Sequence, residues 1–268
     1  MWINPRLCVG CANCVPFCPV GAIAVEPGGV AVIDRDACVE CANCYRSMSR
    51  ENLPPWLVRA LRKVVQLLRL RPDPDLDICP TGAITPEPLE WPRVVRSLFS
   101  DPTSEHKVTG VAGRGTEEAK TNDVTGRTKE GEAGFTVELG RPGVGVTFGD
   151  IERMTMALAR LGISFEPKNP VTSLMEDPRV GRIRRDILQE RILSAIVEFT
   201  VPLEQVPEVL RTVEEVSTQL DTVVSVGVYT KNAPDGSNPL LGILHQLGYR
   251  PRRAKVNMGL GRPLAEVR

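Results

Sequence analysis

The eight cysteines of this 268-residue chain form one pattern that occurs twice. In the first copy, Cys8, Cys11 and Cys14 are spaced by two residues, and a Cys18-Pro19 pair follows. The second copy repeats the spacing of the first three cysteines and has its Cys-Pro pair further on; its members are Cys38, Cys41, Cys44 and Cys79. Both Cys-Pro pairs continue as x-Gly-Ala-Ile, and no cysteine is left over. The thiols therefore point to two equivalent binding sites.

A Cys-x-x-Cys-x-x-Cys run followed by Cys-Pro is the bacterial arrangement that holds a cubane 4Fe–4S cluster. The three closely spaced thiolates wrap one cubane, whereas the Cys-Pro thiolate lies too far along the chain and ligates the other cubane. The pattern thus predicts two clusters with crossed ligand sets. These are Cys8, Cys11, Cys14 and Cys79 for cluster 1, and Cys18, Cys38, Cys41 and Cys44 for cluster 2.

Two other uses of eight cysteines are less well supported. Four disulfides suit a secreted protein, but residues 1–6 lead directly into the motif without a signal peptide, so we expect a cytoplasmic protein. Two structural zinc sites would also use four thiolates each. Zinc modules have separated Cys-x-x-Cys pairs, whereas three cysteines overlap in each run here, so iron–sulfur clusters are favoured over zinc.

Residues 1–48 and 78–85 resemble the two-cluster bacterial-type ferredoxins, including their internal duplication. The resemblance implies a small module of two βαβ halves related by pseudo-two-fold symmetry, with two cubanes close enough to exchange electrons. It also implies low-potential electron transfer as the function, with a redox protein or oxidoreductase subunits as partners.

The second copy departs from the ferredoxin pattern at its fourth ligand. Met48 occupies the position that corresponds to Cys18, and Cys79 comes thirty-one residues later. Because Cys79 has the full Cys-Pro-x-Gly-Ala-Ile context, we interpret residues 45–77 as an insertion that delays this ligand. If Cys79 is not a ligand, cluster 1 has three thiolates and is a 3Fe–4S cluster or a cubane with an open iron.

The insertion contains a predicted amphipathic helix over residues 53–71, with prolines at its start and after its end. Its apolar residues at helical spacing are Leu57, Leu61, Val64, Val65 and Leu68, and its basic face is Arg59, Arg62, Lys63 and Arg69.

We expect the apolar face of this helix to pack on the protein and the basic face to stay solvated. Docking to a redox partner and contact of residues 53–71 with a membrane surface are two further uses. Five cations exclude a transmembrane helix.

The remaining chain predicts an arm and a second domain. We expect a cluster domain at 1–92, an extended linker or arm at 93–134, and an α+β domain at 135–268. Strands are predicted at 135–139, 163–166, 193–201, 222–229 and 254–260, and helices at 150–161, 203–220 and 239–247. This alternation favours an α+β chain, whose C-terminal domain is a ferredoxin-like α/β sandwich with helices on one face.

A short repeat follows the first and last of these strands. Leu139-Gly140-Arg141-Pro142 and Leu260-Gly261-Arg262-Pro263 would place Arg141 and Arg262 together if the two strands are neighbours. Two guanidinium groups could then bind a small anion. Gly-x-Pro is also ordinary turn chemistry, which is the simpler interpretation.

The sequence otherwise has no enzyme motif, and its zero net charge argues against nucleic-acid binding. Residues 91–93, 99–102, 113–118 and 121–127 resemble anaerobe ferredoxin-domain proteins, some labelled 6-hydroxynicotinate reductase, which implies a redox context.

Two classes of function stay open. We favour an electron-transfer protein or subunit of an anaerobic oxidoreductase over a free-standing enzyme. The alternative is an iron–sulfur reductase whose C-terminal domain binds a small anionic substrate or flavin.

Overall fold

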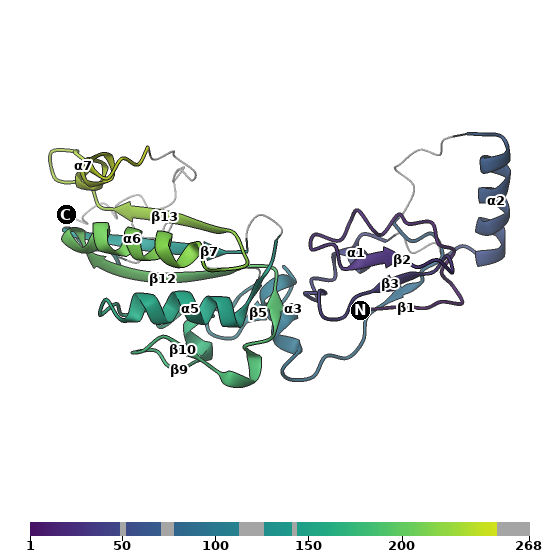
Figure 1. Ribbon diagram of the computed structural model, residues 1–268, viewed down its shortest axis with the longest axis horizontal. Helices are drawn as coiled ribbons and strands as arrows, with labels where there is room; N and C mark the ends of the chain where they lie inside the picture. The colour runs from purple at the N-terminus through teal and green to yellow at the C-terminus, as the bar shows by residue number, and fades with distance from the viewer. Residues whose placement is uncertain (49–51, 71–77, 113–125, 141–143, 251–268) are drawn as a thin grey trace, which may run out of the picture.

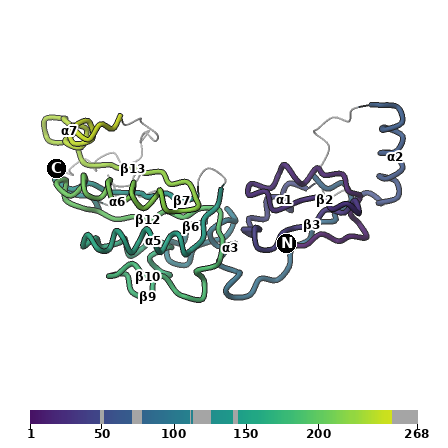
Figure 2. The backbone as a smooth tube through the Cα atoms, in the orientation of Figure 1, coloured from purple at the N-terminus to yellow at the C-terminus, as the bar shows by residue number. Residues whose placement is uncertain are grey.

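The computed structural model describes residues 1–48, 52–70, 78–112, 126–140 and 144–250. These residues form a mixed helix-and-strand protein with an N-terminal body, at the right of Figure 1, and a C-terminal body, at the left. The backbone trace shows helix α3 (Val94–Ser100) between the two, on the side of the C-terminal body that faces the N-terminal one (Figure 2). The expected mixed helix-and-sheet class is therefore confirmed.

The N-terminal body contains two short antiparallel strand pairs and one short helix. β1 (Trp2–Ile3) pairs with β4 (Ile84–Thr85), β2 (Ile23–Val25) pairs with β3 (Ala31–Ile33), and α1 is Asn43–Arg46. The first pair joins the start of the chain to the segment that follows Cys79, and it buries Ile3 and Ile84 side by side. The segment after Cys79 thus lies beside the start of the chain, and the interpretation of residues 45–77 as an insertion stays a prediction.

Helix α2 (Pro55–Leu67) forms within this insertion, and Figure 1 shows it at the end of the molecule remote from the C-terminal body. The expectation that its apolar face packs on the protein is wrong. Val58 is buried, but Leu61 is 53% and Leu68 60% exposed. Two arginines of the basic face turn toward the N-terminal body instead, because they can donate hydrogen bonds to loop carbonyl groups there.

The C-terminal body is built on a three-stranded antiparallel sheet in the order β12-β7-β13. β7 (Glu132–Leu139) is central, and β12 (Ala195–Pro202) and β13 (Val224–Thr230) pair with it on either side. Since both neighbours run antiparallel to β7, they are parallel to each other, and α6 (Val206–Ser217) connects them. This is a split βαβ unit with β7 inserted between its two strands.

The core of the C-terminal body lies between this sheet and its helices. Alternating β7 residues, including Phe135, Val137 and Leu139, are completely buried. α5 (Phe148–Ala159) and α6 pack against each other, and α7 (Pro239–Gln246) packs against α6 and β13.

The smaller elements are β5 (Glu105–His106), β6 (Val111–Ala112), β8 (Val146–Thr147), β9 (Met175–Asp177), β10 (Arg182–Ile183), β11 (Arg191–Ile192) and 3-10 turns at Thr172–Leu174, Arg185–Ile187 and Leu203–Gln205.

Two expectations for the second half of the chain differ from the structure. Residues 94–100, expected as part of an extended linker, form α3, because Val95 and Phe99 lie one helical turn apart and both join the core of the C-terminal body. The strand predicted at 163–166 is reduced to a single bridge between Phe165 and Phe199. The strand predicted at 254–260 lies outside the described residues.

Arg96 of α3 joins the two bodies through a buried side chain that is 7% exposed. Its Nη1 donates to the carbonyl oxygens of Arg35 (3.1 Å), Asp36 (2.9 Å) and Cys38 (2.7 Å) in the N-terminal body. Its Nε pairs with the carboxylate of Glu190 in the C-terminal body. The segment that enters Cys38 is therefore attached directly to the core of the second body.

Replacing Phe135 with Ala should destabilise the C-terminal body by about 3–5 kcal/mol, because the side chain is fully buried and its ring stacks on Phe199 at 5.1 Å. The midpoint of denaturant unfolding, followed by far-UV circular dichroism, measures this loss. Val226→Ala, on the same sheet but 38% exposed, is the control and should cost about 1 kcal/mol or less. If both variants lose the same stability, the conclusion that Phe135 lies in the core of the C-terminal body is contradicted.

Candidate metal centres

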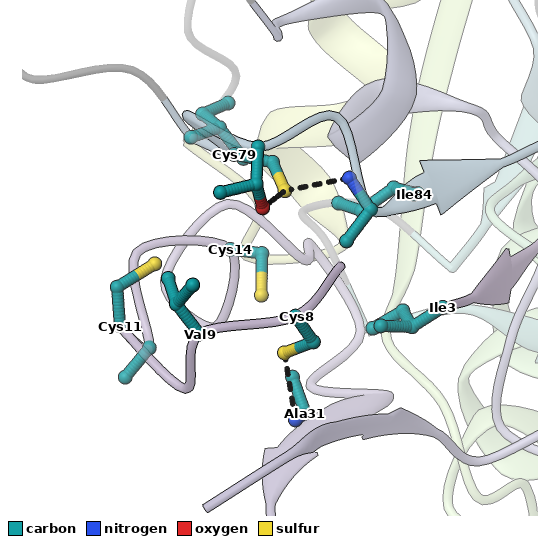
Figure 3. A pocket seen from close by; sticks show the side chains of 12 residues that line it. Ile3, Cys8, Val9, Cys11, Cys14, Ala31, Cys79 and Ile84 are labelled. Atoms are coloured by element: carbon teal, nitrogen blue, oxygen red, sulfur yellow. Dashed lines mark hydrogen bonds between the residues drawn. The ribbon is translucent and has the colours of Figure 1, made fainter. Parts of the chain in front are cut away.

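The four cysteines predicted for cluster 1 lie around one hollow of the N-terminal body. Cys8, Cys11, Cys14 and Cys79 line a cavity of about 300 Å³. Figure 3 shows their side chains around the hollow, with Cys79 on a stretch of chain separate from the loop that carries the other three. Apolar side chains such as those of Ile3 and Ile84 complete the wall.

The four cysteines predicted for cluster 2 line a second hollow of similar size, about 330 Å³. Here the separate member is Cys18, which joins three cysteines of the second copy: Cys38, Cys41 and Cys44. Val20, Ile23 and Val39 supply apolar wall. The structure thus sorts the cysteines into the same two sets as the sequence pattern, and each Cys-Pro thiol crosses to the hollow of the other copy.

The x-Gly-Ala continuation of each Cys-Pro pair has a structural role. Gly21 and Gly82 adopt left-handed backbone conformations, with φ of +67° and +63°. The following amide then points back to sulfur: Ala22 N lies 3.1 Å from Cys18 Sγ, and Ala83 N lies 3.2 Å from Cys79 Sγ. A hydrogen bond to sulfur stabilises the thiolate form, which is the form that binds iron.

The loops around the two hollows repeat the same backbone geometry. Ala12 and Ala42, each between two cysteines, have left-handed φ values of 65° and 54°. A left-handed residue within such a loop turns successive amides toward one side of the backbone, a geometry that suits binding of a negatively charged group. The internal duplication therefore extends from the cysteines to the conformation of the loops.

Gly10 and Glu40 occupy equivalent positions in the two loops, both with positive φ, but their surroundings differ. A Cβ on Gly10 would lie 2.1 Å from the carbonyl oxygen of Gly29, so a side chain has no room there. Glu40 has room, and its buried carboxylate binds the Met1 amino terminus at 2.8 Å and Arg93 at 2.6 Å. Burial alone raises the pKa of Glu40, but these two partners lower it overall, so the carboxylate is charged.

All eight cysteines are reduced thiols in the structure. Burial raises the pKa of Cys14 to about 11 and that of Cys44 to about 12. These thiols are therefore protonated at neutral pH until a metal group binds and displaces the protons. Within the described residues, no three His, Cys, Asp or Glu side chains converge closely enough to hold a single metal ion.

Cys79 lines the hollow of cluster 1, whereas Met48 packs at the edge of the surrounding apolar core. The next residues fix the Cys79 loop, since Thr81 Oγ1 donates to the carbonyl of Leu7 at 2.8 Å. The hollow therefore has four thiols rather than the three considered as the alternative. Ligation by each of these thiols stays a prediction.

Arginines contact the backbone of both cluster loops. At the first hollow, Arg59 and Arg62 of α2 donate to the carbonyl oxygens of Cys8 (3.0 Å) and Val9 (2.7 Å). At the second, Arg46 donates to the carbonyl of Cys41 at 2.6 Å, in addition to the bond from Arg96 to Cys38. The roles of Arg46, Arg93 and Arg96 were not predicted, because spacing alone gave no signal for these contacts.

Arg141 and Arg262, the predicted anion-binding pair, both lie outside the described residues. Their proximity and any flavin or anion site that depends on it stay predictions.

The N-terminal part of the chain is a 4Fe–4S ferredoxin-type domain, and the family model of the 4Fe–4S binding domain matches residues 1–24. Ferredoxin-1 of Rhodobacter capsulatus is 51% identical over 41 residues, which cover 15% of this chain and 62% of that ferredoxin. A ferredoxin-like protein in the vnf region of Azotobacter chroococcum is 50% identical over 43 residues, or 65% of its length.

A tetrathionate reductase subunit of Salmonella typhimurium is 47% identical over 45 residues, which cover 16% of this chain and 18% of that protein. The chain thus spans less than two thirds of each of these relatives. No solved structure matches the chain.

Replacing Cys79 with Ala should damage cluster 1, which keeps three thiols, and preserve cluster 2, because only the first hollow loses a thiol. Iron should fall below eight per chain, and the electron paramagnetic resonance (EPR) spectrum of the reduced protein should show one isolated 4Fe–4S signal. Met48→Ala is the matched control at the position where the repeat would place a ligand, and it should keep both clusters. Full iron content in Cys79→Ala would show that this thiol is not a ligand.

Proposed function

We propose that the chain transfers electrons at low potential through two 4Fe–4S clusters. The observation that carries this proposal is the division of eight thiols between two apolar hollows, four to each, with every Cys-Pro thiol crossing to the other repeat. Cluster 1 is assigned to Cys8, Cys11, Cys14 and Cys79, and cluster 2 to Cys18, Cys38, Cys41 and Cys44. A bound cubane supplies one-electron redox chemistry, and the protein provides thiolates, amide donors and exclusion of water.

The protein groups around each hollow suit this role. The apolar walls limit the access of water, and amides directed at Cys8, Cys18 and Cys79 stabilise negative charge on sulfur. Hydrogen bonds to sulfur and burial are two of the factors that set the reduction potential of such a cluster. Thiols that must stay reduced also favour a reducing compartment, so the proposal includes the cytoplasm.

The partner in this proposal is an oxidoreductase, and the chain is its electron-transfer subunit or dedicated carrier in anaerobic metabolism. The similarity to a reductase subunit supports this role. The C-terminal body, a ferredoxin-like α/β sandwich with a split βαβ unit, would attach the cluster domain to the complex. The exposed apolar face of α2, where Leu67 is 82% and Trp56 70% exposed, supports a second docking surface.

Contact with a membrane surface is an alternative use of this face of α2. Among the described helices, none combines the length and apolar character needed to cross a membrane.

Stepwise reduction of the anaerobically purified protein tests the proposed function. Dithionite should deliver about two electrons per chain, one to each cubane, and bleach a broad visible absorbance without leaving a flavin spectrum. The reduced protein should then return both electrons to a one-electron acceptor. A chain that takes up no electrons, or that binds stoichiometric flavin and reduces a substrate directly, would contradict the carrier function.

A further inference from the structure

The two hollows differ in the charges that surround them. At cluster 1, Arg59 and Arg62 of α2 donate hydrogen bonds to the Cys8–Val9 backbone. Within the described part of the chain, no carboxylate pairs with either guanidinium. Glu26, in the turn between β2 and β3, is an acidic residue of the same region, and its side chain is exposed to solvent. Among the described residues, the cluster 1 loop therefore lies beside two cations that have no acidic partner.

At cluster 2 the cations are paired with acids. Arg46 binds Asp101 at 2.5 Å, and Arg96 binds Glu190. Glu40, which lies two residues from Cys38, neutralises Arg93 and the amino terminus.

Two further carboxylates, Asp34 and Asp36, occupy the segment that leads into Cys38. The carboxylate of Asp34 accepts backbone hydrogen bonds from this segment at 2.8 and 3.2 Å. The charges around cluster 2 therefore approximately cancel.

Net positive charge beside a 4Fe–4S cluster stabilises its reduced form, which carries one more negative charge, and so raises its reduction potential. Among the described residues, the surroundings of cluster 1 are thus more positive than those of cluster 2.

We propose that Arg59 and Arg62 of the inserted helix make cluster 1 the cluster of higher reduction potential, so that electrons pass from cluster 2 to cluster 1. Cluster 2 lies next to the C-terminal body, whose Arg96 holds the Cys38 carbonyl and whose Gly145 lies beside Val20 at the wall of the second hollow. Cluster 1 lies beneath α2. Because two cubanes are part of the proposed function, this inference rests on it and adds a direction of transfer away from the C-terminal body toward α2.

An EPR-monitored redox titration of the intact, cluster-loaded chain tests the direction. The double variant Arg59→Gln/Arg62→Gln should lower the potential of cluster 1. We expect at least a tenfold decrease in the equilibrium constant for its one-electron reduction, which corresponds to about 59 mV. The potential of cluster 2 should stay unchanged. The control Lys63→Gln/Arg69→Gln removes the same charge from exposed positions of the same helical segment and should shift neither cluster, because water and salt screen these charges.

Two further variants separate charge from structure and assign the signals. Arg62→Lys keeps the positive charge and should retain the wild-type potentials. Cys79→Ala leaves cluster 2 as the one intact 4Fe–4S cluster, whose potential should equal that of the lower-potential component of the wild type.

The inference is overturned if the remaining cluster of Cys79→Ala has the higher potential, or if Arg59→Gln/Arg62→Gln and its control shift cluster 1 equally. Either result would leave two working cubanes and the proposed function intact. A wild-type protein without two cubanes would instead remove the proposed function itself.

Discussion

Each candidate metal centre depends on one thiol that crosses over from the other copy of the repeat. Cys18 belongs to the first copy and lines the second hollow, whereas Cys79 belongs to the second copy and lines the first. Neither hollow has four thiols unless both copies are folded against each other. The β1–β4 pair supports this arrangement, because it joins the start of the chain to the segment after Cys79. Cluster binding and folding of the N-terminal body are therefore coupled.

The sequence predicts two cysteine sets, because ligand spacing and the Cys-Pro context are local properties of the chain, and the same sets line the two hollows, while ligation stays a prediction. It also predicted a helix in the insertion, which forms over Pro55–Leu67. The direction in which this helix faces could not be predicted, since periodicity identifies an apolar face but not the side on which a neighbour lies. Val58 and the two arginines contact the protein, while Leu61 and Leu68 remain exposed.

Long-range contacts account for most of what the sequence did not predict. Arg96 looked like an ordinary charged residue in a linker, yet it binds three carbonyl groups about sixty positions earlier in the chain and a carboxylate ninety-four positions later. The helix that carries it is short, and its apolar side chains Val95, Leu98 and Phe99 pack on the core of the C-terminal body, a contact that the sequence did not reveal. Through these contacts the insertion and the second body surround the cluster module from two sides, α2 at cluster 1 and α3 at cluster 2.

The eight thiols of this chain are proposed to hold two cubanes and no other metal. Quantitative iron, acid-labile sulfide and zinc analysis of anaerobically purified protein tests this most directly. Two cubanes predict about eight iron and eight sulfide per chain, with zinc well below one equivalent. Two equivalents of zinc with little iron and no sulfide would contradict them, since the same eight thiols would then hold two structural zinc ions.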